Sequence, residues 1–244
     1  MHLILDFGNT LFKHFVFNQQ AQLADGKAMH THWQQTVKQI LNDYPDINAV
    51  IISDVSGITS EQDYSLFKGL QVFVCNSKLR LPFLNHYKTP GLLGADRIAL
   101  VAAGAVLYPN KDILIIDLGT CITYDFKDKN NNYWGGAISP GFSTRYKSLQ
   151  QNTGKLPQLE PTNPINPIGD STENAIHSGI FYGILFEIQG QIAFYQKKTQ
   201  NLTIIFAGGD AQMLPKSFKN SIFAHSNFLA KGLNYILELN KTEC

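Results

Sequence analysis

Two short segments, one in each half of the chain, share the pattern that most constrains the fold. Residues 3–10 read Leu-Ile-Leu-Asp-Phe-Gly-Asn-Thr, and residues 114–120 read Leu-Ile-Ile-Asp-Leu-Gly-Thr. Each begins as a short apolar run, typical of a buried strand, and then reaches Asp-x-Gly. The glycine permits a tight reversal into a second β-rich run, at residues 11–17 and 121–126. Such a turn directs backbone N–H groups and Thr or Asn side chains to one point, which suits a phosphate group.

The repetition also predicts the organisation of the chain. One copy alone is compatible with an ordinary turn, because Asp and Gly are common turn residues. Two copies, each ending a buried strand and each followed by Thr, favour the functional interpretation. They predict two similar subdomains, residues 1–110 and 111–244, facing each other across a nucleotide cleft. This feature indicates a phosphotransferase.

Composition excludes several other classes of protein. The 20 basic and 19 acidic residues give a net charge of +1, and binding to a nucleic-acid backbone needs clustered Lys and Arg. No apolar stretch approaches the roughly 20 residues that span a bilayer, and Asp6 interrupts the first hydrophobic run, so we expect neither a membrane segment nor a signal peptide. The three cysteines, Cys75, Cys121 and Cys244, have no metal-type spacing. We therefore expect a cytoplasmic, reduced protein.

Between the two Asp-x-Gly units the sequence alternates strand and helix patterns, which predicts a sheet flanked by helices. We expect buried strands at residues 49–53, 72–74, 113–116 and 202–206, and helices at residues 33–41, 61–67, 96–107, 143–151, 173–196 and 227–239. Residues 81–94 and the proline-rich residues 157–167 predict loops. The glycines at 135 and 136, before Pro140 and Gly141, indicate a bend that leads into a helix.

The segment Gly94-Ala95-Asp96-Arg97 lies where a loop enters a predicted helix. Asp96 could act only as a capping or first-turn acid that complements the helix dipole. That interpretation leaves Arg97 unexplained, because a cation is poorly placed at a helix start. The alternative is that Asp96 is a general base for an alcohol and that Arg97 binds an anionic group of the substrate. Local chemistry leaves both interpretations open.

Other candidate features are weaker. Gly208 and Gly209 after the last strand form a turn or allow a nucleotide to approach the backbone. Lys13 follows the first turn and could reach a phosphate, although an isolated Lys on a strand is usually solvated. The seven histidines show no ligand spacing, so we assign them no metal. The chain has no P-loop motif, so phosphate binding would use the Asp-x-Gly turns.

In this order, the motifs resemble the type III pantothenate kinases, which belong to the superfamily of actin, heat-shock chaperones and sugar kinases. The resemblance covers nearly the whole chain except residues 18–80. The matching pieces are Asp6-x-Gly-Asn-Thr10, Tyr87 with Pro90, Gly94-Ala-Asp-Arg97, Asp117-x-Gly-Thr120 with Thr123, Gly135-Gly-x-Ile-x-Pro-Gly141, Arg145, Leu149, Thr153, Leu156-Pro157, Gly169-x-Ser-Thr172, Gly179 and Gly208-Gly209. Cys121 departs from the pattern, where a small residue such as Ala is expected.

The resemblance implies an α/β protein with two ribonuclease H-like subdomains, the actin-like ATPase fold. It implies phosphorylation of pantothenate by ATP, the first step of coenzyme A biosynthesis. The cofactors would be ATP, magnesium and a monovalent cation, potassium or ammonium. The protein would be a homodimer without a nucleic-acid or membrane partner.

The resemblance also implies roles for individual residues. Asp96 would be the catalytic base, and Asp117 would bind the monovalent cation. The residues that would contact ATP are Asp6, Phe7, Gly8, Asn9, Thr10, Leu11, Phe12, Lys13 and Thr120. The residues that would contact pantothenate are Tyr87, Gly94, Ala95, Asp96, Arg97 and Thr172, of which Thr172 would close over it.

Two alternatives remain at this point. One is a kinase for another small alcohol or sugar, and Arg97 argues against it because most sugars lack a carboxylate. The other is a non-catalytic accessory or regulatory member of the family. The intact Asp6, Asp96 and Asp117 argue against that, because a protein without catalysis has no chemical need for all three.

Overall fold

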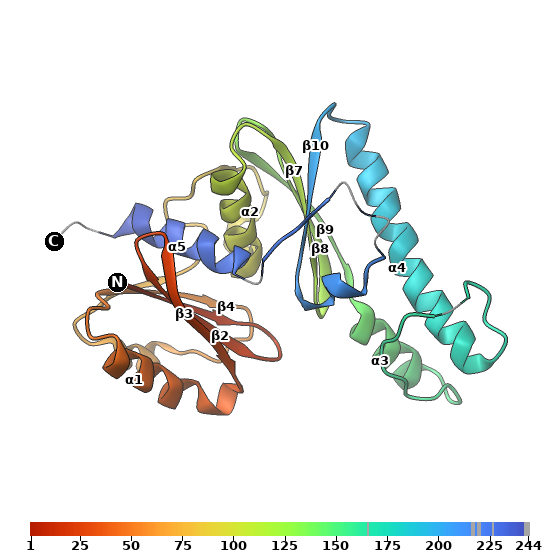
Figure 1. Ribbon diagram of the computed structural model, residues 1–244, viewed down its shortest axis with the longest axis horizontal. Helices are drawn as coiled ribbons and strands as arrows, with labels where there is room; N and C mark the ends of the chain where they lie inside the picture. The colour runs from red at the N-terminus through yellow and green to blue at the C-terminus, as the bar shows by residue number, and fades with distance from the viewer. Residues whose placement is uncertain (165, 216–217, 219–220, 226, 242–244) are drawn as a thin grey trace. The chain divides into compact units, whose positions relative to one another are not determined.

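A computed structural model describes residues 1–164, 166–215, 218, 221–225 and 227–241 (Figure 1). Cys244, and residue 165 of the predicted 157–167 loop, lie outside these ranges. The chain forms two compact units. The first comprises Met1–Pro109, Asn131–Tyr133 and Asn227–Cys244, and the second comprises Asn110–Asn130 and Trp134–Ser226. These units differ from the expected subdomains in where residue 110, residues 131–133 and residues 227–241 fall.

The first unit is built on a sheet with the strand order β3-β2-β1-β4-β5. The strands are β1 (His2–Phe7), β2 (Phe12–Asn18), β3 (Ala21–Ala28), β4 (Ala49–Asp54) and β5 (Gln71–Val74). β1 pairs antiparallel with β2 and parallel with β4. All residues of β1 are buried, as expected for a central strand covered on both faces.

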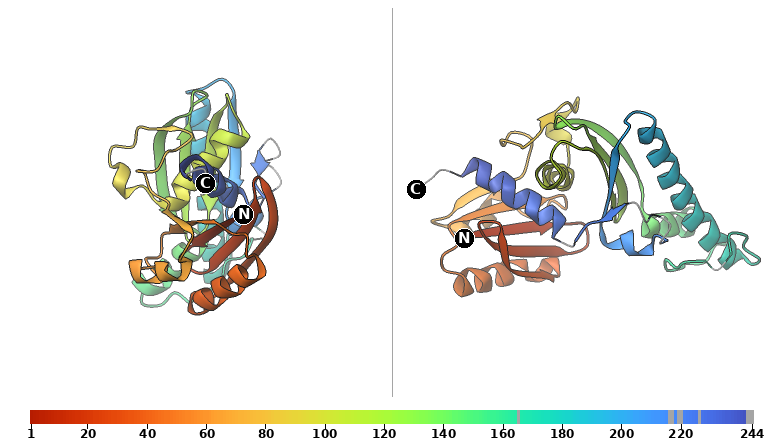
Figure 2. Two further views of the ribbon diagram at one scale, coloured as in Figure 1. Left: turned by 90° about the vertical axis from the view of Figure 1, so that its left-hand side faces the viewer. Right: turned by 45° about the horizontal axis from the view of Figure 1, so that its top comes forward.

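Helices cover both faces of this sheet (Figures 1 and 2). On one face, α1 (Trp33–Asp43) buries Trp33, Val37 and Ile40 against β1, β2 and β4. On the other face lie α2 (Ala95–Leu107) and the C-terminal helix α5 (Phe228–Asn240). A Cβ at Gly232 of α5 would lie 1.9 Å from the Ala99 carbonyl oxygen of α2, so glycine lets the two helix backbones approach closely. Short 3-10 turns occupy His30–His32, Glu61–Phe67 and Pro90–Leu92.

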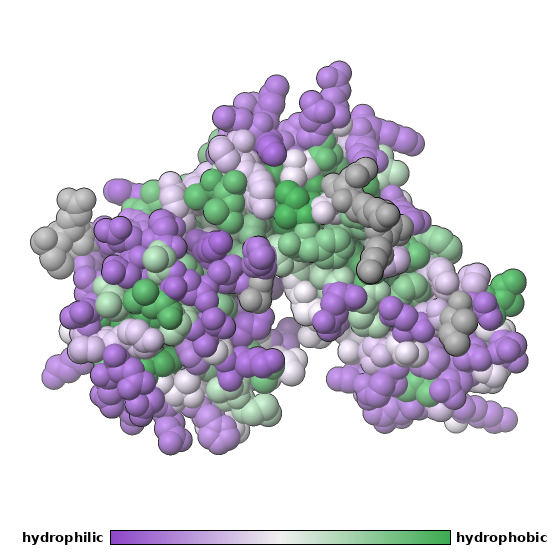
Figure 3. Space-filling model, in the orientation of Figure 1, coloured by the Kyte–Doolittle hydropathy of each residue, from purple (hydrophilic) through white to green (hydrophobic). Residues whose placement is uncertain are grey.

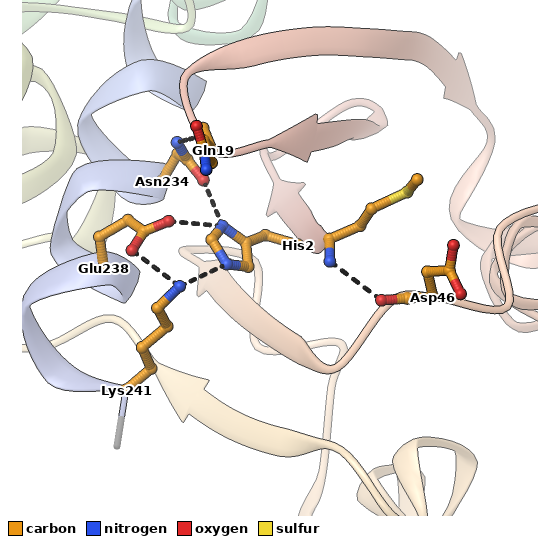
Figure 4. Close-up of polar contacts among 7 residues, drawn as sticks. His2, Gln19, Asp46, Asn234, Glu238 and Lys241 are labelled. Carbon is orange, nitrogen blue, oxygen red and sulfur yellow. Dashed lines mark hydrogen bonds and ion pairs between the residues drawn. The ribbon is translucent and has the colours of Figure 1, made fainter. Parts of the chain in front are cut away.

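Hydrogen bonds of the buried His2 connect the start of β1 to α5 and to Lys241, which follows it (Figure 4). The Nδ1 atom of His2 lies 2.9 Å from Asn234 Oδ1 and 3.3 Å from Glu238 Oε1, so it donates, since both partners are acceptors. The Lys241 ammonium lies 3.2 Å from His2 Nε2 and 2.8 Å from Glu238 Oε2. The ring is therefore the neutral Nδ1–H tautomer. Burial, the largest cause, lowers the pKa of His2 and agrees with this assignment.

The second unit contains a sheet with the strand order β11-β10-β7-β8-β9. The strands are β7 (Asp112–Leu118), β8 (Cys121–Lys127), β9 (Asn132–Pro140), β10 (Leu202–Ala207) and β11 (Ile222–Phe223). β7 pairs antiparallel with β8 and parallel with β10, as β1 does with β2 and β4. The two Asp-x-Gly strands therefore occupy equivalent places in their sheets. β6 (Leu84–Asn85) pairs in parallel with Asn132 and Tyr133, the residues of β9 that belong to the first unit.

One face of this sheet packs against α3 (Phe142–Asn152) and the long α4 (Thr172–Gln196). Their apolar residues, among them Phe142, Tyr146 and Ile184, bury the side chains of Leu114, Ile116 and Leu118 on β7. A 3-10 turn at Gly209–Met213 follows β10. None of the helices in the described part of the chain is long and apolar enough to cross a membrane. On the face seen in Figure 3, hydrophilic residues predominate towards the edges of the view, and hydrophobic residues are more frequent near its middle.

The predicted helices and buried strands are present with small shifts at their ends. Residues 61–67 form a 3-10 helix, and residues 173–196 belong to a single long helix. Four points of the sequence prediction need correction. The sequence does not predict β3 or β11, the predicted loop at residues 81–94 contains the short strand β6, and the predicted bend at Gly135 and Gly136 is instead part of strand β9. A Cβ at Gly136 would lie 1.6 Å from the Tyr124 carbonyl oxygen, so this glycine serves close strand packing.

Candidate active site

The first Asp-x-Gly turn joins β1 to β2 in the first unit. The backbone N–H of Gly8 donates to the Leu11 carbonyl oxygen at 3.2 Å, which closes the turn. Asn9 and Thr10 at its tip are exposed, whereas Phe7 and Phe12 anchor its base through stacked rings 4.7 Å apart. The turn thus presents two polar side chains above a stacked aromatic pair.

Asp6 lies at the end of β1 between two polar neighbours in register. Lys13 faces it from β2, and Ser53 faces it from β4 and donates a 3.2 Å hydrogen bond to Asp6 Oδ1. Burial raises the pKa of Asp6 to about 6, while Lys13 and the Ser53 hydroxyl act to lower it. The charges of Asp96 and Asp54 act in the opposite direction and raise it. Asp6 is therefore a buried carboxylate that depends on its neighbours to stay ionised.

The Gly94–Arg97 segment begins α2 in the same unit. Gly94 is the N-cap residue, and Asp96 lies in the first turn, where its Oδ1 accepts a 2.7 Å hydrogen bond from the Arg97 backbone N–H. Asp96 is half-buried and close enough to Asp6 for its charge to raise the pKa of Asp6. The structure therefore brings together the first turn and the predicted base, which are far apart in sequence.

The Arg97 side chain is only 5% exposed although it carries a charge. Its Cζ atom lies 5.5 Å from the ring centroid of Tyr87, within the range of a cation–π interaction. The Tyr87 ring in turn stacks on Tyr133, with centroids 6.2 Å apart. The aromatic pair holds the guanidinium in place, and Tyr87, Gly94, Ala95, Asp96 and Arg97 thus form one group at the start of α2.

The second Asp-x-Gly turn lies in the second unit, between β7 and β8. The Gly119 N–H donates to the Cys121 carbonyl oxygen at 3.0 Å, and Thr120 at the tip is exposed. Asp117 is half-buried, and its register neighbours are Thr123 on β8 and Ala207 on β10. Asp117 and Thr120 thus occupy the places that match Asp6 and the first turn.

Thr172 is the first residue of α4 and is exposed. It lines a cavity of about 740 Å³ between α3 and α4, together with Arg145, Leu156 and Gly179. Arg145 is already engaged, since it pairs with Glu187 and donates a 2.9 Å bond to the Pro140 carbonyl oxygen. Thr172 therefore lies on the second unit, apart in the chain from the Asp96 group on the first unit.

The sequence analysis gives no functional role to two residues near this group. It places Ser53 only in a buried strand, although a hydroxyl residue at the end of an apolar run could have indicated a polar contact there. Cys75 follows β5, and burial together with the charges of Asp96 and Asp6 raises the pKa of its thiol to about 12. Its Sγ lies 3.7 Å from the Ala95 carbonyl oxygen, so Cys75 packs beneath the start of α2.

Comparison with solved structures identifies the fold. A polyphosphate/ATP-glucomannokinase from Arthrobacter sp. strain KM matches with a TM-score of 0.50 and 12% identity, covering 97% of this chain and 98% of the other. A Campylobacter jejuni protein, provisionally named a Baf family transcriptional activator, matches with a TM-score of 0.66 and 19% identity, covering 97% of each chain. At such identities the likeness shows the fold alone. That fold is the actin-like ATPase fold of sugar kinases, with two subdomains.

Sequence comparison then identifies the family. The profile of the type III pantothenate kinases matches residues 2–193. A type III pantothenate kinase of Christiangramia forsetii is 46% identical over 243 residues, covering 100% of each chain. The chain belongs to the type III pantothenate kinase family, which confirms the resemblance seen in its motifs.

Proposed function

We propose that this protein transfers the γ-phosphoryl group of ATP to the primary hydroxyl group of pantothenate, the first step of coenzyme A biosynthesis. Membership of the family supports this activity. The observation that carries it is the group at the start of α2, where Asp96 stands beside a buried Arg97 and near Asp6. A candidate base, a candidate anion-binding side chain and a turn that suits phosphate lie within one unit, which supports the proposal.

The turn from Asp6 to Lys13 would bind the phosphates of ATP. Its exposed Asn9 and Thr10 and the charge of Lys13 suit phosphate oxygens. Phosphoryl transfer needs positioning and charge neutralisation more than covalent chemistry, and the family implies a divalent metal, magnesium, that supplies part of the neutralisation. The turn above the stacked Phe7 and Phe12 would provide the positioning.

Asp96 would accept the proton of the attacking hydroxyl group. Asp96 lies in the N-terminal turn of α2, where the helix dipole is positive. The 2.7 Å bond from the Arg97 N–H fixes one carboxylate oxygen. Asp96 is thus oriented, and it remains half exposed so that a substrate can reach it.

Arg97 would bind the carboxylate of pantothenate, with Tyr87, Gly94 and Ala95 around it. A guanidinium forms two parallel bonds to a carboxylate, and the Tyr87 ring pre-orients it. Thr172, on the second unit, would also contact pantothenate. These roles explain why a charged side chain is buried at a helix start, where the dipole disfavours it.

Asp117 would bind a monovalent cation, potassium or ammonium, and Thr120 would contact ATP. The residues fit such an ion, because Asp117 supplies carboxylate oxygens and its register neighbour Thr123 carries a buried Oγ1 without a hydrogen-bond partner among the described residues. The ion would offset negative charge near the phosphates. We further propose a homodimer, which the family resemblance supports, and a cytoplasmic location, where ATP is available.

The decisive experiment measures ADP release by the purified protein with pantothenate, with common sugars and with the amide analogue of pantothenate. We expect release with pantothenate only, and none in the Asp96→Asn variant. Release with a sugar instead would identify another small-molecule kinase. A folded protein that binds ATP and phosphorylates none of these compounds would support the non-catalytic alternative.

A further inference from the structure

The two Asp-x-Gly strands differ in what faces each aspartate across the sheet. Asp6 has Lys13 on its antiparallel neighbour and Ser53 on its parallel neighbour. At the equivalent positions Asp117 has Thr123 and Ala207. Directly opposite residues in a sheet have Cβ atoms about 4.5–5.5 Å apart, so their side chains interact. Thus Asp6 faces the ammonium group of Lys13, whereas the equivalent position opposite Asp117 holds the hydroxyl group of Thr123.

The hydroxyl group of Thr123 is buried and makes no hydrogen bond to the described residues. The residue is 7% exposed, and its Oγ1 has no hydrogen-bond partner within the described part of the chain. An unsatisfied buried hydroxyl destabilises the fold, and such groups commonly mark a missing ion or water molecule. By contrast, the Ser53 hydroxyl of the first unit already donates to Asp6.

We propose that Thr123 is a ligand of the monovalent cation, through its Oγ1 and together with Asp117, and that this ion does there what the ammonium group of Lys13 does beside Asp6. The inference rests on the proposed function, because it concerns the cation of that reaction. A hydroxyl oxygen and a carboxylate are both hard oxygen ligands of the kind that potassium accepts, and both accept hydrogen bonds from ammonium. The small exposed surface of Thr123 belongs to its other atoms, so a rotation about its Cα–Cβ bond accompanies binding.

Binding of a non-hydrolysable ATP analogue, measured by calorimetry, tests this without turnover. The titration is run in potassium chloride and in choline chloride at equal ionic strength, for the wild type and three variants. Thr123→Val removes the oxygen at nearly constant volume, and Thr123→Ser keeps it. Thr203→Val makes the same change on β10 of the same sheet, opposite Ile113 and away from Asp117.

We expect potassium to strengthen nucleotide binding by the wild type, by Thr123→Ser and by Thr203→Val. In Thr123→Val the potassium concentration for half-maximal effect should rise roughly five- to tenfold, the equivalent of one lost polar contact. The same potassium response in Thr123→Val and the wild type would overturn the proposal, and would indicate that a water molecule or only the nucleotide meets Thr123.

A tethered cation provides a second test. Thr123→Lys introduces at this position the residue type that faces Asp6, so its ammonium group would take the place of the ion. A folded variant should therefore bind the nucleotide equally well in potassium and in choline. Continued dependence on potassium in a folded Thr123→Lys protein would contradict the proposal. Failure of the proposed function is distinguishable, because that outcome is an absence of pantothenate phosphorylation by the wild type, whatever the cation response of nucleotide binding.

Discussion

Replacing Asp6 by Asn should make the first unit more stable at neutral pH while it removes activity. Burial raises the pKa of Asp6 from 3.8 to about 6 in the folded protein, and the unfolded chain keeps the ordinary value. At low pH both states hold the proton, so this carboxyl has no effect. As the pH rises from about 4 to 6, the unfolded state loses its proton first, and the free energy of unfolding falls.

The size of this effect follows from the shift. A difference of about 2.2 pKa units at about 1.36 kcal/mol each gives up to about 3 kcal/mol of stability lost by the wild type above pH 6. Asn carries no charge and can still accept the hydrogen bond from Ser53. The Asp6→Asn variant should therefore match the wild type near pH 4 and exceed its free energy of unfolding by up to about 3 kcal/mol at pH 7.5. Stability exchanged for function is common at active sites.

Tryptophan fluorescence can follow this unit alone. The chain has two tryptophans, and Trp33 is buried in the first unit with its ring 5.3 Å from that of Phe7, next to Asp6. In a Trp134→Phe background, urea unfolding of Trp33 would be recorded from pH 4 to 8. The control is Asp63→Asn, in which the free energy of unfolding at neutral pH should fall instead of rise. Hydrogen bonds from Ser60 lower the pKa of Asp63, so its ionised form stabilises the fold. An Asp6→Asn protein no more stable than the wild type at pH 7.5 would refute the reasoning.

Three further variants test other parts of the structure. Asp96→Asn should lower turnover by about 100- to 10,000-fold with ATP binding retained, and near-normal turnover in steady-state kinetics would exclude a general base. Arg97→Lys should raise the KM for pantothenate more than that for ATP, since a point charge cannot form the bidentate pair; equal changes would argue against carboxylate binding. Gly232→Ala should lower the free energy of unfolding by about 1–3 kcal/mol, because the new Cβ meets the Ala99 carbonyl oxygen; unchanged urea unfolding would show that the helices can separate freely.

Local sequence patterns account for most of the elements but not for all of them. β1, β7 and β10 are continuous apolar runs, which makes them easy to predict. β3 was missed because its residues alternate between exposed and partly buried positions and include no long apolar side chain except Leu23. β9 was read as a bend because two adjacent glycines usually interrupt a strand, whereas here Gly136 makes room for the backbone of β8.

The sequence predicts which residues form the candidate site but not how they are arranged. Motifs point to Asp6, Asp96 and Arg97. The effect of Asp96 on the pKa of Asp6, however, depends on the packing of α2 against β4, the strand that pairs with β1, and this long-range arrangement is not visible in short motifs. Ser53 and Thr123 acquire meaning only through strand register, since a shift of one residue would turn each side chain to the other face of its sheet. Register depends on the assembled sheet, and short patterns do not encode it.

The placement of α5 has a consequence for biosynthesis of the chain. This helix covers a sheet whose strands are all synthesised before it, and the residues between β5 and α5 include α2 and the whole of the second unit. At about 5–20 residues per second, the nascent sheet waits several seconds for its cover. During that interval the apolar side chains beneath α5 are open to chaperones. Truncation of the chain before Phe228 would therefore remove part of the cover of the first unit's sheet, although it deletes none of that sheet's strands.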